Sequence, residues 1–149
     1  MGQSHRYQVV AWWASGRTGM LKSDSAPNSL HFAAPTEFGG MEGRWTPEDL
    51  LLGALAGCFV TTFRVLAEYS NWEYTDLQVQ AEALADKADS GYRFRKIILR
   101  PHLRILGEAD RSRAVQLLKK AESLCLVSRA LGFEPAFEPL VEVGSPDKN

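Results

Sequence analysis

Two cysteines carry the residue type and the surroundings that thiol chemistry requires. Cys58 lies in the apolar run Ala54-Leu55-Ala56-Gly57-Cys58-Phe59, and Cys125 lies in the run Ser123-Leu124-Cys125-Leu126-Val127-Ser128. They are too far apart for a CxxC motif, but each stands where a helix could hold a thiol. A buried thiol that can reach a second thiol is the minimal equipment for reducing a peroxide, so this chemistry is the first hypothesis.

Composition and charge narrow the class of protein. The chain has 149 residues, 45% of them hydrophobic, and a formal net charge of −1 without a basic stripe. We therefore expect a single soluble domain (residues 1–149, core about 7–143, polar tail 144–149) that binds neither nucleic acid nor membrane. The N-terminus lacks an apolar signal core, and the longest apolar stretch, 50–66, is broken by glycines, threonines and Arg64. These features predict a cytoplasmic protein in which thiols stay reduced. Three scattered histidines predict no metal site, and no bound cofactor is expected.

The order of elements predicts an α+β fold. Strand patterns, turns and helical periodicity give strands at 7–13, 20–25 and 30–34, a glycine-rich loop at 35–44, a helix from 46 to about 69, strands at 77–84 and 92–105, a helix at 109–124, a short helical turn at 127–131 and a final strand at 137–143. The predicted order is βββ-α-ββ-α-β.

The first long helix is the centre of this arrangement. Thr46 is a good N-cap, Pro47 suits the first helical position, and Glu48 and Asp49 supply acids to the first turn. The helix is apolar on most faces, so we expect it to be buried almost all round. One chain with a single other long helix cannot cover it, which predicts a partner chain.

Five segments together resemble the OsmC/Ohr family (osmotically inducible protein C and organic hydroperoxide resistance protein). The segments are Gly16-Arg17-Thr18-Gly19, Phe38-Gly39-Gly40, Trp45-Thr46-Pro47-Glu48-Asp49-Leu50-Leu51, Ala54-Leu55-Ala56-Gly57-Cys58-Phe59 and Cys125-Leu126-Val127-Ser128-Arg129-Ala130-Leu131. The resemblance spans about residues 7–143. Leu126 departs from the family pattern, which has proline after the second cysteine, and Thr46 stands where the family has asparagine.

The resemblance implies an intertwined homodimer with an OsmC-like fold and active sites at the interface. It implies a thiol-dependent peroxidase that reduces organic hydroperoxides to alcohols in defence against oxidative stress. The implied electron donor is an external dithiol, such as a lipoylated protein.

Four residues receive roles in this chemistry. Cys58 is the predicted peroxidatic thiolate and Cys125 the resolving thiol that converts a sulfenic acid to a disulfide. Burial raises a thiol's pKa, so a cation must favour the thiolate, and Arg17 is the candidate. Glu48 is the candidate partner that orients the guanidinium of Arg17.

The spacing of Glu48 and Cys58 suggests why two chains would be needed. They are ten positions apart, roughly 15 Å along one helix, so one straight helix cannot bring them to one site. Two antiparallel copies crossing near Gly53 would bring Glu48 of one chain toward Cys58 of the other. The small residues around Gly53 would permit such a close crossing.

Simpler explanations compete with each assignment. A cysteine on an apolar helix is often a small buried hydrophobe, Glu48 is explained by the helix dipole, and Arg17 by a solvated turn. Ser128 could cap or hold the turn that carries Cys125. The candidate wall of an apolar substrate pocket is Phe38, Trp45, Leu51, Phe59 and Phe63. The alternative function is a non-catalytic OsmC-like dimer that binds an apolar ligand or senses oxidants through Cys58.

Overall fold

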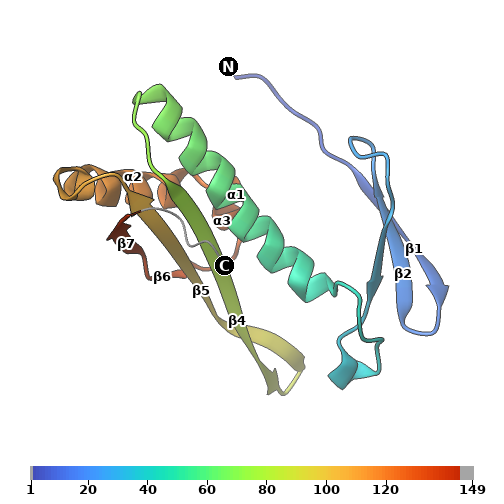
Figure 1. The fold of residues 1–149 in the computed structure, drawn as a ribbon. Helices are drawn as coiled ribbons and strands as arrows, with labels where there is room; N and C mark the ends of the chain where they lie inside the picture. Colours follow the sequence, from blue (N-terminus) through green and yellow to red (C-terminus); the bar gives the residue numbers. More distant parts are fainter. Residues whose placement is uncertain (1, 145–149) are drawn as a thin grey trace. The chain divides into compact units, whose positions relative to one another are not determined.

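The computed structural model describes residues 2–144, which form two compact units, Met1–Leu51 and Leu52–Asn149. Each unit is described by itself, and the single-domain organisation stays a prediction. Apart from Gly144, the predicted polar tail lies outside the described residues. The elements can be followed along the chain in Figure 1.

The first unit is built on an antiparallel meander, as predicted. Strands β1 (Val9–Ser15), β2 (Thr18–Ser23) and β3 (Leu30–Ala33) pair in the order β1-β2-β3. The tight turn between β1 and β2 requires glycine at position 16, where φ is +53°. A short 3₁₀ turn, η1 (Thr36–Phe38), follows β3 and leads into the Gly39-Gly40 loop.

Helix α1 (Pro47–Tyr69) begins at the position that the sequence predicted. The backbone N–H of Asp49 donates to Thr46 Oγ1 at 3.0 Å, and the backbone N–H of Thr46 donates to Asp49 Oδ2 at 3.0 Å. This reciprocal pair satisfies two amide groups at the helix start, a contribution of about 1 kcal/mol. The helix starts in the first unit and continues through the second.

The second unit contains a sheet of β4 (Asp76–Ala88), β5 (Gly91–Ile105), β6 (Ala136–Phe137) and β7 (Leu140–Val143). Antiparallel β4 flanks β5 on one side, and parallel β6 and β7 share its other side. The predicted final strand 137–143 is therefore split in two. Pro139 lies at the break and Pro101 lies on β5 opposite it, and neither can donate a backbone N–H to the ladder.

The helices of this unit besides α1 are α2 (Arg111–Leu124), which follows the 3₁₀ turn η2 (Glu108–Asp110), and α3 (Leu126–Ala130). The core of the unit lies between the sheet and its helices. Every fourth residue of α1 enters the core, as do alternate residues of β5 and the apolar face of α2. The buried members are Leu55, Phe59, Phe63, Ala67, Ile97, Leu99, Leu103, Ile105, Ala114, Leu117, Leu118, Ala121 and Cys125. Apolar side chains at helical and strand periodicity thus position both cysteines.

In the described residues the opposite face of α1 is exposed, in line with the expectation that one chain cannot cover this helix; its burial by a partner chain stays a prediction. Val60 and Val65 are exposed, and nothing lies within 4 Å of a side chain added at Gly57. By length and composition α1 is apolar enough to cross a membrane, with a mean hydropathy of 1.9, although the glycines, threonines and Arg64 had argued against this. Core helices of soluble proteins meet the same criterion of length and composition.

Candidate functional site

The fold brings Cys58 and Cys125 together. Cys58 lies on α1 and packs against the core cluster that contains Cys125. Cys125 joins α2 to α3, with φ −62° and ψ 114°, and has no exposed surface. Both thiols are free, and the two side chains lie close enough for each to shift the pKa of the other. The pair is therefore one half-buried sulfur backed by one fully buried sulfur.

Hydrogen bonds favour the thiolate form of Cys58. Burial raises the pKa of Cys58, but donors from α3 and α1 outweigh it and hold the pKa below the usual 9.0. These donors are the backbone N–H of Val127, the Cys125 thiol, the Thr62 hydroxyl and the backbone N–H of Leu126. The Thr62 hydroxyl oxygen lies 3.9 Å from the Cys58 sulfur.

The opposite holds for Cys125. Burial raises the pKa of Cys125 to about 11, despite a hydrogen bond from the backbone N–H of Ser128. A hydrogen bond to Cys58 and the negative charges of Cys58 and Glu122 contribute to this rise. Both sets of contacts favour one arrangement, a thiolate at Cys58 beside a protonated thiol at Cys125.

The backbone of Leu126 contributes a hydrogen-bond donor to this site. Leu126 is the first residue of α3, and its backbone N–H is one of the donors to the Cys58 sulfur. A proline at this position would have no N–H to donate. The departure from the family pattern therefore adds a hydrogen-bond donor, while Cys125 stays within hydrogen-bonding reach of Cys58.

The first unit holds Arg17 and Glu48. Arg17 is exposed, and its guanidinium donates to the backbone carbonyl of Phe38 at 2.5 Å. Gly39 makes this approach possible, because a side chain there would begin 2.6 Å from Arg17 Nη1. One carboxylate oxygen of Glu48 is buried and has no hydrogen-bond partner. In the part of the chain that the structure describes, Arg17 and Glu48 form no ion pair with each other.

The predicted pocket wall divides into two groups. Phe38 and Trp45 are exposed and Leu51 is partly exposed, so all three could contact a ligand. Phe59 and Phe63 have no exposed surface and stack in the core, with ring centroids 6.4 Å apart. In the described chain both rings lie in the core, Phe59 beside Phe137 and Phe63 beside Trp72 and Tyr74, and their place on a ligand-facing wall stays a prediction.

Sequence reasoning missed two residues near the thiols. Thr62 is one helical turn after Cys58, a spacing that could have identified it. Glu122 lies on the polar part of α2, where a carboxylate is ordinarily solvated. Its position is evident only from the fold, because α3 folds back so that the Ser128 hydroxyl donates to Glu122 Oε1 at 2.7 Å.

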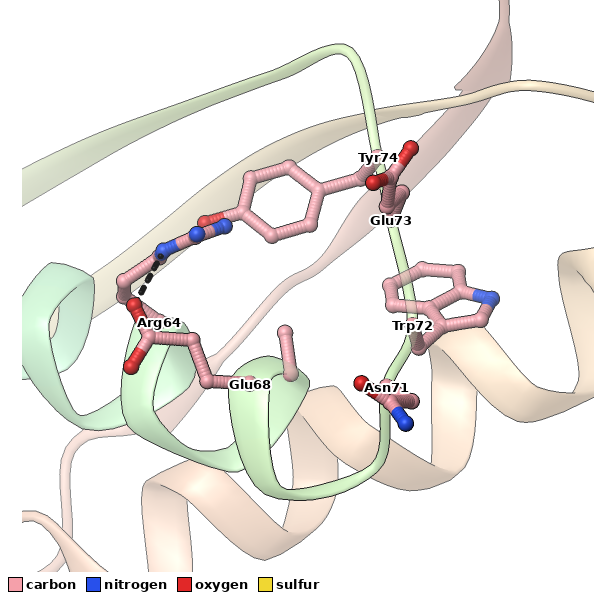
Figure 2. Close-up of a pocket in the computed structure, with 7 residues that line it drawn as sticks. Arg64, Glu68, Asn71, Trp72, Glu73 and Tyr74 are labelled. Carbon is pink, nitrogen blue, oxygen red and sulfur yellow. Dashed lines mark hydrogen bonds and ion pairs between the residues drawn. The ribbon is translucent and has the colours of Figure 1, made fainter.

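A cavity of about 500 Å³ lies at the C-terminal end of α1 and does not include either thiol (Figure 2). Its lining residues are Arg64, Ala67, Glu68, Asn71, Trp72, Glu73 and Tyr74. Arg64 pairs with Glu68 at 2.9 Å and lies over the Tyr74 ring. The positive charge of Arg64 is therefore balanced by the carboxylate of Glu68 inside the cavity.

Comparison with known proteins identifies the family of the chain. The family model for OsmC-like protein matches residues 40–139. The chain is 31% identical over 145 residues to the uncharacterized protein YmaD of Bacillus subtilis, covering 94% of this chain and 97% of that protein. It is 29% identical over 107 residues to peroxiredoxin OsmC of Escherichia coli, covering 72% and 73%.

Solved structures share the fold. The crystal structure of an organic hydroperoxide resistance protein OsmC from Legionella pneumophila superposes with a TM-score of 0.72 at 24% identity, covering 95% of this chain and all of that one. This likeness confirms the α+β architecture with its central helix. On the family match and the architecture together, the chain belongs to the OsmC-like protein family.

Proposed function

We propose that the chain is a thiol peroxidase that reduces organic hydroperoxides to alcohols. The observation that carries the proposal is the pairing of Cys58, partly buried on α1, with the fully buried Cys125 at the start of α3, in which the pKa of Cys58 is lowered and that of Cys125 is raised. A peroxidatic cysteine must be a thiolate that the peroxide can reach, and a resolving cysteine must lie beside it as a protonated thiol. Relatives named for peroxiredoxin activity and for organic hydroperoxide resistance support this reading.

The reaction has two steps. The Cys58 thiolate attacks the terminal oxygen of the hydroperoxide, the O–O bond breaks, and the departing alkoxide takes a proton from water to become an alcohol. Cys58 is then a sulfenic acid. The sulfur of Cys125 attacks Cys58, a disulfide forms, and the hydroxyl of the sulfenic acid leaves with the Cys125 proton as water. An external dithiol reduces the disulfide and restores both thiols.

Arg17 and Glu48 complete the proposed chemistry in a homodimer. We assign Arg17 to stabilising the thiolate and the departing alkoxide, and Glu48 to orienting Arg17. The unpartnered buried oxygen of Glu48 supports this, because a buried carboxylate oxygen ordinarily has a donor. The uncovered apolar face of α1 supports the dimer, since a second chain would bury it.

The first test is the mass of the intact reduced protein before and after one equivalent of cumene hydroperoxide, without reductant. We expect the loss of two hydrogens, with the disulfide mapped to Cys58 and Cys125. Gain of one oxygen at Cys58 alone would remove the resolving role and favour an oxidant sensor. No change in mass would overturn the peroxidase and favour an apolar-ligand-binding protein.

Single variants separate the two roles. Cys58→Ser should abolish peroxide consumption, because the nucleophile is gone. Cys125→Ser should consume one equivalent and then stop, because the sulfenic acid has no partner. Many fast turnovers by Cys125→Ser with a dithiol would contradict the assignment of Cys125.

A further inference from the structure

The segment that follows α1 folds back over the end of that helix and encloses the cavity of Figure 2. The helix ends where Asn71 takes a left-handed conformation, with φ at +50°, and the backbone N–H of Trp72 donates to the carbonyl of Ala67 at 2.9 Å. Such an ending satisfies the carbonyls of the last turn while it reverses the chain. The next three side chains, Trp72, Glu73 and Tyr74, therefore line the cavity beside α1.

Two aromatic rings form a wall of this cavity that is held from behind. The ring centroids of Trp72 and Tyr74 are 5.9 Å apart. Phe63, which has no exposed surface, contacts both rings at right angles or nearly so, with centroid distances of 6.3 Å and 5.2 Å. The face of an aromatic ring attracts cations, and the guanidinium carbon of Arg64 already lies 6.0 Å from the centroid of the Tyr74 ring. The wall is thus preformed and suited to positive charge.

The charged side chains of the lining have an excess of negative charge. Two of them, Glu68 and Glu73, are acidic and one, Arg64, is basic. Arg64 pairs with Glu68 at 2.9 Å, whereas Glu73 forms no ion pair with any residue of the described range 2–144. The C-terminal end of α1 adds the negative end of the helix dipole. From α2, Arg113 donates to the carbonyl of Ser70 at 3.3 Å but does not line the cavity.

We propose that this cavity binds an organic ammonium ion, which contacts the Trp72 ring and the carboxylate of Glu73. An alkylated ammonium carries its charge under apolar carbons, so an aromatic wall can replace its water where a small metal ion would stay hydrated. The volume of about 500 Å³ lies in the range of small-molecule cavities. Neither thiol lines this cavity, so the inference goes beyond the proposed peroxidase and does not depend on it.

The test uses choline as the probe. It is titrated into the isotope-labelled full-length protein, and the indole N–H signal of Trp72 is followed by nuclear magnetic resonance. That signal is identified by its absence from Trp72→Phe, a variant that keeps an aromatic ring. We expect a saturable shift of this signal, and binding at least about fivefold weaker for the neutral isostere dimethylbutanol, which has the same shape without the charge. The indole signals of the other tryptophans should not move; these are Trp12, Trp13 and Trp45.

Two variants should change the affinity for choline in opposite directions. Glu73→Gln removes the unpaired carboxylate and should weaken binding by about threefold to fivefold. Arg64→Gln removes a competing cation from the Tyr74 ring and frees Glu68, so it should tighten binding by a similar factor of about threefold to fivefold. Asp89→Asn, in the exposed β4–β5 turn, removes one negative charge elsewhere and should leave the affinity unchanged.

The proposal fails if choline does not move the Trp72 signal, or if dimethylbutanol binds as tightly as choline. Unchanged or tighter binding of choline by Glu73→Gln would also overturn it. Acetate is the opposite probe: a saturable shift with acetate that disappears in Arg64→Gln would identify an anion site instead. The comparison of choline with dimethylbutanol is made on the parent protein, so it holds even where a variant proves unfolded by circular dichroism.

Discussion

The acidity of Cys58 depends on individual donors, of which Thr62 is the side chain most easily removed. Thr62→Val keeps the shape of the side chain and deletes the hydroxyl that lies 3.9 Å from the sulfur. One such hydrogen bond contributes about 1 kcal/mol, so oxidation by hydroperoxide at pH 7 should slow by about fivefold. The measurement is the pH dependence of the first-turnover rate.

The sign of this dependence follows from the thiolate. Below the pKa of Cys58 the rate should fall tenfold per pH unit, and above it the rate should level off. Because the hydrogen bond from Thr62 helps to hold the pKa of Cys58 below the usual 9.0, the plateau should begin at higher pH in Thr62→Val than in the parent. Thr61→Val is the matched control, since the Thr61 hydroxyl bonds to the carbonyls of Gly57 and Cys58 and not to the sulfur. An equal effect of both variants would exclude a contact-specific cause.

At the scale of elements, the Gly39-Gly40 loop after η1 is shaped by Arg17. Gly39→Ala and Gly43→Ala both place a side chain at positive φ, +76° and +84°, which costs about 1–2 kcal/mol. Only the former meets Arg17, whereas nothing lies within 4 Å of the latter. Gly39→Ala should therefore be more destabilising by about 0.5–1.5 kcal/mol, the worth of the lost Arg17–Phe38 hydrogen bond. Urea unfolding measures the difference.

A double-mutant cycle isolates this contact. In an Arg17→Ala background the two glycine variants should lose equal free energy of unfolding, because the guanidinium that distinguishes them is gone. A difference that persists without Arg17 would show that the loop itself, and not its contact with Arg17, sets the cost.

At the scale of the whole molecule, the uncovered face of α1 predicts a dimer that depends on small side chains. Gly57→Leu meets nothing within 4 Å inside its own chain and improves helix propensity, so a single chain should tolerate it. In two α1 helices crossing closely, the same side chain would occupy the space of the partner. We expect the parent to sediment as a dimer and Gly57→Leu to shift toward monomer or aggregate.

A comparable change elsewhere controls for added hydrophobicity. Lys119→Leu places the same side chain on the exposed face of α2 and should leave the dimer intact. A parent that sediments as a monomer at all concentrations, or a Gly57→Leu protein with unchanged mass, would remove the proposed helix crossing.

Local patterns were sufficient for most of the fold. The Thr46-Pro47 start of α1, the meander and the long β4–β5 hairpin follow from capping, turns and periodicity, which act over a few residues. The break between β6 and β7 was missed although Pro139 marks it, because the apolar pattern continues on both sides. The exposure of one face of α1 in a single chain was expected from its apolar composition, but periodicity does not reveal what covers that face.

The site was less accessible to sequence reasoning. The types of Cys58 and Cys125 suggested a pair, but their contact depends on how α3 turns back at Cys125. Glu122 and the backbone donors at Leu126 and Val127 owe their roles to that turn alone. The roles of Arg17 and Glu48 stay predictions. Phe59 and Phe63 were assigned to a ligand wall because aromatic residues beside a thiol suit either a pocket or a core.

The unequal burial of the two cysteines makes it possible to measure how often the core opens. A bulky maleimide can reach the half-buried sulfur of Cys58 in the native state, but Cys125 has no exposed surface and waits for the core to open. After Cys58 is blocked, the rate at which Cys125 becomes labelled measures the population of the opened state. The chain thus carries both a probe and its reference, without any engineered label.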